Sequence, residues 1–228
     1  MNNPPPRSGS TVARSAVSDQ TRIAILDAAW DLVAESGRLE AGQAEIAARA
    51  GVSRQTVYLA FGGRAGLLLA MLHNHDRRSP QVRRLNEVAQ GSGDRPQDLF
   101  DFLGAWLDYL PDIFPVGILL DAASLHDAEA AAAWDDRMKT ALLTGVRVIA
   151  RRLEAAGWLA PGWSVDAAAE LAWSLVHPTA WRLLVIQCGW SPDAFRQSRF
   201  DLIGRTLLVA EPPTAAKERT RRHRSRAG

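Results

Sequence analysis

Hydrophobic residues recur along this chain at the three- and four-residue spacing of amphipathic helices, and no segment shows the two-residue alternation of a strand. The first helical run begins near Ser18 or Asp19 and ends at Gly37, a residue that commonly terminates helices. Two short helices are expected over 43–50 and 54–60. A longer one follows Gly62-Gly63 and ends before Ser79-Pro80, where the chain is expected to break.

Six further helices are expected beyond this break. Prolines separate some of them: Pro111 and Pro115 are typical of a turn, and Pro178 should kink or split the helix that contains it. The expected ranges are 81–90, 96–109, 116–125, 128–156, 165–187 and 192–209.

The composition agrees with an all-α fold, since the chain is 47% hydrophobic, rich in Ala and Leu and poor in Tyr and Phe. Its 228 residues fit one larger domain, or a small domain and a medium one. We expect four parts: a Pro- and Ser-rich disordered arm (1–17), a helix-turn-helix domain (18–78), a larger helical domain (79–210) and a basic disordered tail (211–228).

The segment from Ala44 to Leu68, AEIAARAGVSRQTVYLAFGGRAGLL, has the spacing of a helix-turn-helix. A small residue, Ala47, lets two helices cross closely, and Gly51 provides the left-handed backbone of a sharp turn. Ile46 and Val57 are expected to fill the small core, and Ser53 is a good N-cap for the second helix.

With these apolar residues facing inward, the outer surface of the second helix carries Arg54, Gln55, Thr56, Tyr58 and Leu59. Arg and Gln have donors that match base edges in the major groove, and Tyr can hydrogen-bond phosphate oxygens. The pattern therefore indicates a DNA-recognition helix, although short Ala- and Gly-containing helices also occur in ordinary helical cores.

The flanking residues add specificity. IAILDAAWDLVAESG, then IAARAGVSRQTVYLAF, then GGRAGLLLAML, in this order and spacing, resemble the N-terminal DNA-binding domain of the TetR family of transcriptional repressors over about Thr21 to Leu72. Some positions depart from the family pattern. Gly42 stands where a Ser or Thr is usual, Ala60 where a His or aromatic is usual, and Arg64-Ala65 replaces a Lys-Glu pair.

The resemblance implies a role for each matching residue. Gln55, Thr56 and Arg54 would face base edges, whereas Tyr58, Arg64, Ser53 and Gln43 would hold the DNA backbone. It also implies that the larger domain binds a small-molecule effector and forms the dimer interface, that the partner is a palindromic double-stranded operator, and that the ligand releases the repressor from it.

Seven of the eight Trp residues lie in the larger domain, with other aromatics at helix-compatible spacing, which indicates a concave, mostly apolar pocket or else ordinary core and dimer contacts. Asp121, His126 and His177 are candidate polar anchors, although His177 can instead cap the helix that Pro178 begins. The candidate ligand-binding residues are Phe102, Trp106, Phe114, Asp121, Trp134, Met138, Trp173, His177 and Trp181.

Two recognition helices, about 34 Å apart, are needed to read successive turns of DNA. We therefore expect a homodimer through the helices near 165–187 and 192–209. Its apolar face would be supplied by Leu171, Leu175, Leu183, Leu184, Leu202, Leu207 and Leu208.

The net charge is only +2, but the six Lys and Arg after Pro212 face Glu218 alone and leave the rest of the chain at −3. This tail can add salt-dependent, non-specific DNA binding. One cysteine, no signal-peptide pattern and no apolar run near the roughly 18 residues of a membrane span predict a cytoplasmic protein without a membrane partner.

No metal or cofactor motif and no catalytic constellation stands out. Two alternatives remain at this point. One is a helical enzyme or carrier with a structural N-terminal domain, which would keep its function without residues 1–78. The other is an architectural DNA-binding protein that senses no ligand.

Overall fold

A computed structural model describes residues 17–36 and 42–212, and these residues form helices joined by short turns. Within this described part, β-bridging is limited to one isolated antiparallel bridge between Leu159 and Leu208. In chain order the helices are α1 (Asp19–Ser36), α2 (Gln43–Arg49), α3 (Arg54–Phe61), α4 (Arg64–Asp76), α5 (Pro80–Gln90), α6 (Pro96–Ser124), α7 (Ala128–Asp135), η1 (Asp136–Leu143), α8 (Thr144–Ala155), α9 (Val165–Leu175), α10 (Pro178–Trp181), η2 (Arg182–Gln187) and α11 (Pro192–Leu207).

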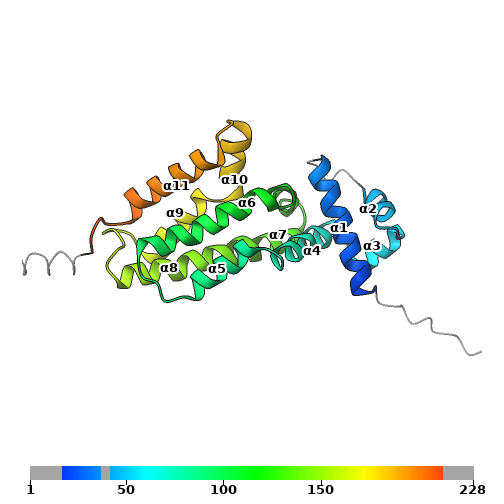
Figure 1. Cartoon of the computed structure of the whole chain (residues 1–228). Coiled ribbons are helices and arrows are strands. Elements are labelled where there is room, and N and C mark those ends of the chain that lie inside the picture. The colour runs from blue at the N-terminus through cyan, green and yellow to red at the C-terminus, as the bar shows by residue number, and fades with distance from the viewer. Residues whose placement is uncertain (1–16, 37–41, 213–228) are drawn as a thin grey trace, which may run out of the picture.

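The molecule is elongated, with α1 to α3 at one end and α5 to α11 at the other, and α4 leads from the first group into the second (Figure 1). The all-α prediction is confirmed. The predicted arm and basic tail fall almost wholly outside the described residues; at their edges, Val17 packs on the hydrophobic core. The predicted division at residues 78 and 79 follows α4, which packs on both α1 and α6.

The N-terminal helices enclose a small core, as their spacing predicts. Ile46 and Val57 are each 1% exposed, and they lie in one hydrophobic cluster with Ile25 of α1 and Leu68 of α4. With 7 and 8 residues, α2 and α3 are too short to be stable alone in water, so this shared burial holds the unit together.

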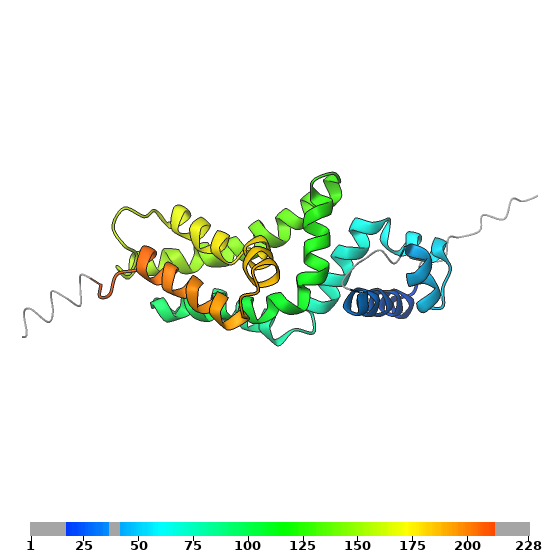
Figure 2. The ribbon, with the colours of Figure 1, turned by 90° about the horizontal axis from the view of Figure 1, so that it is seen from above.

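The prediction of two helices over 96–109 and 116–125 is wrong, because α6 continues for 29 residues through both Pro111 and Pro115. Each proline removes one backbone hydrogen bond and crowds the preceding turn. The helix persists because its apolar residues are buried against α4, α5, α7 and α8 along its whole length. In Figure 2 the green α6 changes direction along its course, which is the expected response of a helix to internal prolines.

The other two long predicted helices depart from regular α-helix in different ways. The run 128–156 is continuous but passes through a π-helical segment, η1. The run 165–187 breaks at Val176 and His177, directly before Pro178, and this break was predicted. After the break a second π-helical segment, η2, precedes the turn into α11.

In the described part of the chain, α6 is the one single helix long and apolar enough to cross a membrane, and the consecutive helices α3 and α4 pass the same test only as a pair bent by 72°. Of the apolar window in α6, 61% is buried inside the fold. This burial is typical of the central helix of a helical core.

Candidate functional site

The recognition helix α3 is fixed at both ends by its own sequence. At its start, the Ser53 hydroxyl accepts a hydrogen bond from the Thr56 backbone N–H at 3.0 Å, so the predicted N-cap is confirmed. The turn before it depends on Gly51, whose φ of 66° lies in the left-handed region, as predicted. Gly62, with φ of 74°, makes the corresponding turn from α3 into α4.

The outer surface of α3 is polar and exposed. Arg54 and Gln55 are exposed and Thr56 is half-buried, while Tyr58 and Leu59 are 58% and 55% exposed. The surface predicted for base and phosphate contact is therefore open to a partner. Its chemistry, with a guanidinium, an amide and a phenol beside one apolar side chain, suits the edges and backbone of duplex DNA.

The remaining predicted DNA-contacting residues flank this surface. Gln43 opens α2, and Arg64 opens α4. Neither Arg54 nor Arg64 forms an ion pair with another described residue, so both guanidinium groups are available to phosphate. Gly42 provides no side-chain cap for α2, in agreement with the departure noted in the sequence.

Contacts from α1 and α2 hold this unit in shape, and spacing alone did not identify them. Arg22 of α1 donates a hydrogen bond to the Ala60 carbonyl at the end of α3, and its guanidinium lies 4.7 Å from the centre of the Phe61 ring. Arg49 of α2 pairs with Glu35 of α1 through two hydrogen bonds of 2.8 and 2.9 Å. This ion pair connects α2 to α1 at the surface of the unit.

A cavity of about 140 Å³ lies where the end of α4 meets α5, α6, η1 and α8. Its walls are mostly apolar, and only two of its lining residues, Asp76 and Arg137, are charged. Gly145 permits close packing here, since a Cβ at this position would lie 2.4 Å from the Phe102 ring. The lining residues are Asp76, Val82, Leu85, Asn86, Ala89, Phe102, Trp106, Tyr109, Arg137, Ala141, Leu142 and Gly145.

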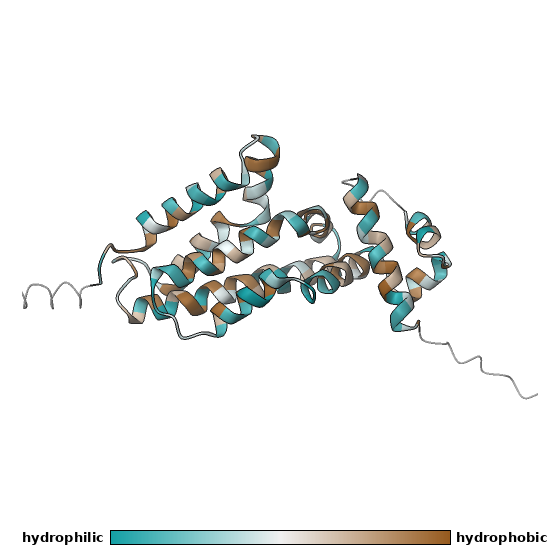
Figure 3. Cartoon of the chain, in the orientation of Figure 1, coloured by the Kyte–Doolittle hydropathy of each residue, from teal (hydrophilic) through white to brown (hydrophobic). Residues whose placement is uncertain are grey.

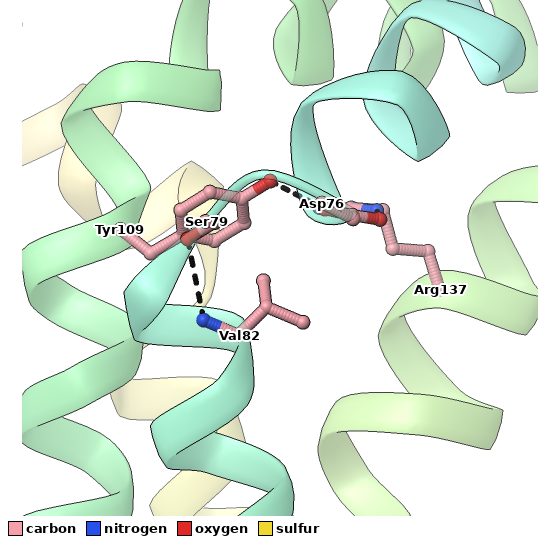
Figure 4. Close-up of polar contacts among 5 residues, drawn as sticks. All are labelled: Asp76, Ser79, Val82, Tyr109 and Arg137. Atoms are coloured by element: carbon pink, nitrogen blue, oxygen red, sulfur yellow. Dashed lines mark hydrogen bonds and ion pairs between the residues drawn. The ribbon is translucent and has the colours of Figure 1, made fainter.

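The polar side of this cavity is a three-residue cluster of Asp76, Tyr109 and Arg137 (Figure 4). Arg137 holds both carboxylate oxygens of Asp76, at 2.6 and 2.8 Å, and the Tyr109 hydroxyl donates to the same carboxylate. Just beyond it, Ser79 caps α5 by accepting from the Val82 N–H at 3.2 Å (Figure 4). The last residue of α4 is thus tied to α6 and η1.

These contacts set the charge states of the cluster. Burial acts to raise the pKa of Asp76, but the Arg137 guanidinium and the Tyr109 hydroxyl more than offset it, and the net pKa is lowered. Burial, together with the Asp76 carboxylate, raises the pKa of Tyr109, so its phenol stays protonated. At neutral pH the cluster is an ion pair with no net charge.

Of the predicted ligand-binding residues, Phe102 and Trp106 line this cavity. Asp76 and Arg137 carry no signal of this site in the sequence, because their helices are distant from each other along the chain. The residues that the structure places outside this cavity lining are Phe114, Asp121, Trp134, Met138, Trp173, His177 and Trp181.

Several of these residues surround the break between α9 and α10. His177 accepts a hydrogen bond from the Thr179 N–H through Nδ1 and so caps α10, the alternative role that the sequence suggested for it. The rings of Trp134 and Trp173 stand edge-on to it, at 5.9 and 5.1 Å between ring centres. Trp181 packs against Phe195 of α11.

The helices expected at the dimer interface expose large apolar side chains. Exposed fractions are 45% for Leu183, 57% for Ile186, 39% for Trp190 and 46% for Leu202. Hydrophobic positions recur along α11 in Figure 3. Leu207, in contrast, is 1% exposed and belongs to the core of its own subunit.

In the part of the chain that the structure describes, no group of three or more His, Cys, Asp or Glu side chains is placed to hold a metal ion. The ring of His75 stacks on the ring of Trp30, with 4.2 Å between the ring centres. The capped and exposed α3 and the helices around it form a helix-turn-helix unit, and α4 connects this unit to the larger helical bundle.

The N-terminal unit is similar to a known family. Residues 25–71 match the model of the bacterial regulatory proteins of the tetR family. No protein of curated function matches the sequence.

Solved structures share the fold over most of the chain. A transcriptional regulator from Saccharomonospora viridis, solved with choline, is 20% identical, with a TM-score of 0.69 over 84% of this chain and 100% of the other. A TetR-family regulator from Rhodococcus sp. is 22% identical, with a TM-score of 0.63 over 81% and 97%. NalD, the secondary repressor of the MexAB-OprM multidrug efflux pump in Pseudomonas aeruginosa, is 24% identical, with a TM-score of 0.59 over 84% and 98%.

Proposed function

We propose that this regulator is a homodimeric repressor that binds a palindromic operator and leaves it when a small molecule enters the cavity of the larger domain. The observation that carries the proposal is the placement of α4. Its first turn follows the recognition helix directly, and its last residue, Asp76, lies in the cavity wall. One rigid helix therefore joins the DNA-binding surface to the ligand cavity.

The length of α4 makes this connection effective. A helix of 13 residues is about 20 Å long, so a tilt of about 5° at the cavity end moves the other end by roughly 2 Å. A ligand with unequal affinity for the two positions of α4 shifts the population between them. In a dimer, the same tilt in both subunits changes the spacing of the recognition helices relative to successive major grooves.

For the DNA contacts, we propose that Gln55, Thr56 and Arg54 read base edges, and that Tyr58, Arg64, Ser53 and Gln43 hold the sugar-phosphate backbone. The exposure of Arg54, Gln55 and Tyr58, together with the N-cap that orients α3, supports these roles. For the dimer, the apolar side chains exposed on η2 and α11 support pairing across a two-fold axis.

A small-molecule effector agrees with the choline complex of the similar Saccharomonospora viridis regulator. The cavity of this chain is the stronger argument for a small-molecule effector, because it is mostly apolar and contains one convergent polar cluster.

The test is a gel-shift assay with the full-length protein and the DNA upstream of its own gene. We expect retardation at low salt that persists in excess non-specific competitor and decreases as the salt concentration rises. Absence of sequence-specific retardation at low salt would contradict the proposal.

A further inference from the structure

The Asp76–Tyr109–Arg137 cluster is more than an ion pair between helices, because it leaves one strong donor without a partner. Arg137 is 11% exposed, and its two terminal nitrogens are both bonded to Asp76. Its third N–H group, at Nε, is buried and has no hydrogen-bond partner among the described residues. Burying an unpaired donor of this kind lowers the stability of the fold, and a bound acceptor would remove this penalty.

The backbone conformation of η1 also indicates a functional site at this cavity. Arg137, Ala141 and Leu142 reach the cavity from η1, a π-helical segment between two α-helical ones. π-Helical turns are less stable than α-helical turns and occur frequently at functional sites. Without the widened turn, the residues of η1 would project in different directions.

The charges of the cavity limit what it can bind. Asp76 and Arg137 neutralise each other, and both oxygens of the carboxylate are already occupied. Burial also lowers the pKa of the adjacent His75, although Asp112 and Asp76 oppose this, so the imidazole is neutral at pH 7. An anionic ligand would bring a charge with no counter-ion into this space, and a cationic ligand would find no free carboxylate.

The volume of the cavity and the chemistry of its walls determine the size and the apolar character of the ligand. A cavity of about 140 Å³ is close to the volume that holds one benzene-sized molecule. Phe102, Trp106 and Tyr109 provide aromatic walls, and Leu85 and Leu142 provide aliphatic ones. These walls favour a single ring or an aliphatic group of similar size.

We infer that the effector is a small, neutral, largely apolar molecule with one hydrogen-bond acceptor, such as a carbonyl oxygen, which binds the Nε–H group of Arg137. This inference rests on the proposed function for its regulatory meaning, but the chemistry of the site can be tested without DNA. Because Arg137 also holds the end of α4, the ligand meets the helix that connects the cavity to the recognition surface.

Three probes of nearly equal size separate the possibilities: acetophenone, which is neutral with an acceptor; ethylbenzene, which is neutral without one; and benzoate, which is anionic. Ligand-observed NMR titration of the full-length protein measures the three affinities. We expect acetophenone to bind about tenfold more tightly than either of the others. Equal binding of acetophenone and ethylbenzene, tighter binding of benzoate, or no binding of acetophenone at its solubility limit would overturn the inference.

Two variants connect the affinity to the site. Arg137→Lys retains a positive charge opposite Asp76 but removes the Nε–H group, so the preference for acetophenone over ethylbenzene should disappear. Ala89→Leu fills the cavity from α5 without touching the polar cluster, so it should weaken both probes. Thermal unfolding of each variant verifies that it is folded, and an unchanged preference in folded Arg137→Lys would contradict the assignment.

Gel shifts then distinguish this inference from the proposed function. Operator binding that saturating acetophenone releases in the wild type, but not in Arg137→Lys, supports both. Selective binding of acetophenone with no specific operator binding would leave the site chemistry supported and the repressor proposal contradicted.

Discussion

At the scale of single residues, the exposed side chains of α3 and its neighbours divide into two chemical groups. Gln55 carries an amide that can pair with a base edge, whereas Arg64 stands at the first position of α4 and carries a charge suited to phosphate. The two residues therefore report on different parts of DNA recognition.

Gln55→Ala should reduce the preference for operator over random DNA, with a loss of about 1–3 kcal/mol in the free energy of specific binding. Arg64→Ala should weaken binding to both DNAs by a similar factor and reduce the salt dependence by about one phosphate contact. Fluorescence-anisotropy titrations against both duplexes at several salt concentrations measure these effects. The same pattern in both variants would show that the roles are wrongly assigned.

His75 gives the fold a pH dependence. Burial lowers its pKa below the ordinary histidine value, so at mildly acidic pH the unfolded chain binds this proton more readily than the folded chain. The free energy of unfolding should therefore fall as the pH is lowered through about 6.5, the unfolded value, and level off below the folded pKa.

His75→Phe retains a ring between Trp30 and Tyr109 but cannot bind a proton, so its stability should depend less on pH than that of the wild type. His177, whose pKa burial also lowers although Asp121 opposes this, accounts for part of the slope that remains. Urea unfolding between pH 5 and 7.5 measures the difference. Identical slopes for wild type and variant would exclude His75 as a contributor.

At the scale of elements, the helix-turn-helix depends on backbone conformation as much as on packing. Gly51 has a positive φ, and the position that a Cβ would take is open, so a side chain there would contact no neighbour but would strain the backbone. Gly42, at the start of α2, has equally open space and a φ of −58°, which any residue adopts. The two glycines form a matched pair.

Gly51→Ala should destabilise the N-terminal unit by about 1 kcal/mol, because the Cβ of alanine is strained at the positive φ of this residue. Gly42→Ser, the matched control, should be neutral or stabilise by a few tenths of a kcal/mol through a side-chain cap. Thermal unfolding of both variants checks the prediction. Equal stability of Gly51→Ala and wild type would show that the turn adapts.

At the scale of the whole molecule, the exposed apolar side chains of η2 and α11 are the strongest indication of a second subunit. Leu183 and Leu202 are nearly half exposed, on helices that the sequence analysis had assigned to the dimer interface. Isolated apolar residues are normal on a surface, but several on neighbouring elements favour an interface.

The double variant Leu183→Glu and Leu202→Glu should be monomeric at micromolar concentration, because each carboxylate would be buried without a partner on pairing. Since one recognition helix contacts only one half-site, specific operator binding should be lost with the dimer. Sedimentation equilibrium and gel shifts on the same samples measure both effects. Leu125→Glu, at an exposed residue outside these helices, is the control, and a stable dimer of the double variant would place the interface elsewhere.

The N-terminal unit could be predicted from the sequence because its interactions are local. Gly51, Ser53, Ile46 and Val57 lie within twelve residues, and short-range spacing determines which of them turn, cap or pack. The same holds for Pro178, which ends one helix and begins another wherever it lies in the fold.

The tertiary structure alone decided the course of α6 and the make-up of the cavity. Pro111 and Pro115 would end a helix in isolation, and burial of the apolar residues around them keeps it intact. Asp76 and Arg137 are 61 residues apart, so their ion pair has no signature in either segment. Local propensity and spacing act over a few residues, whereas a ligand site is formed by packing between segments that the sequence keeps far apart.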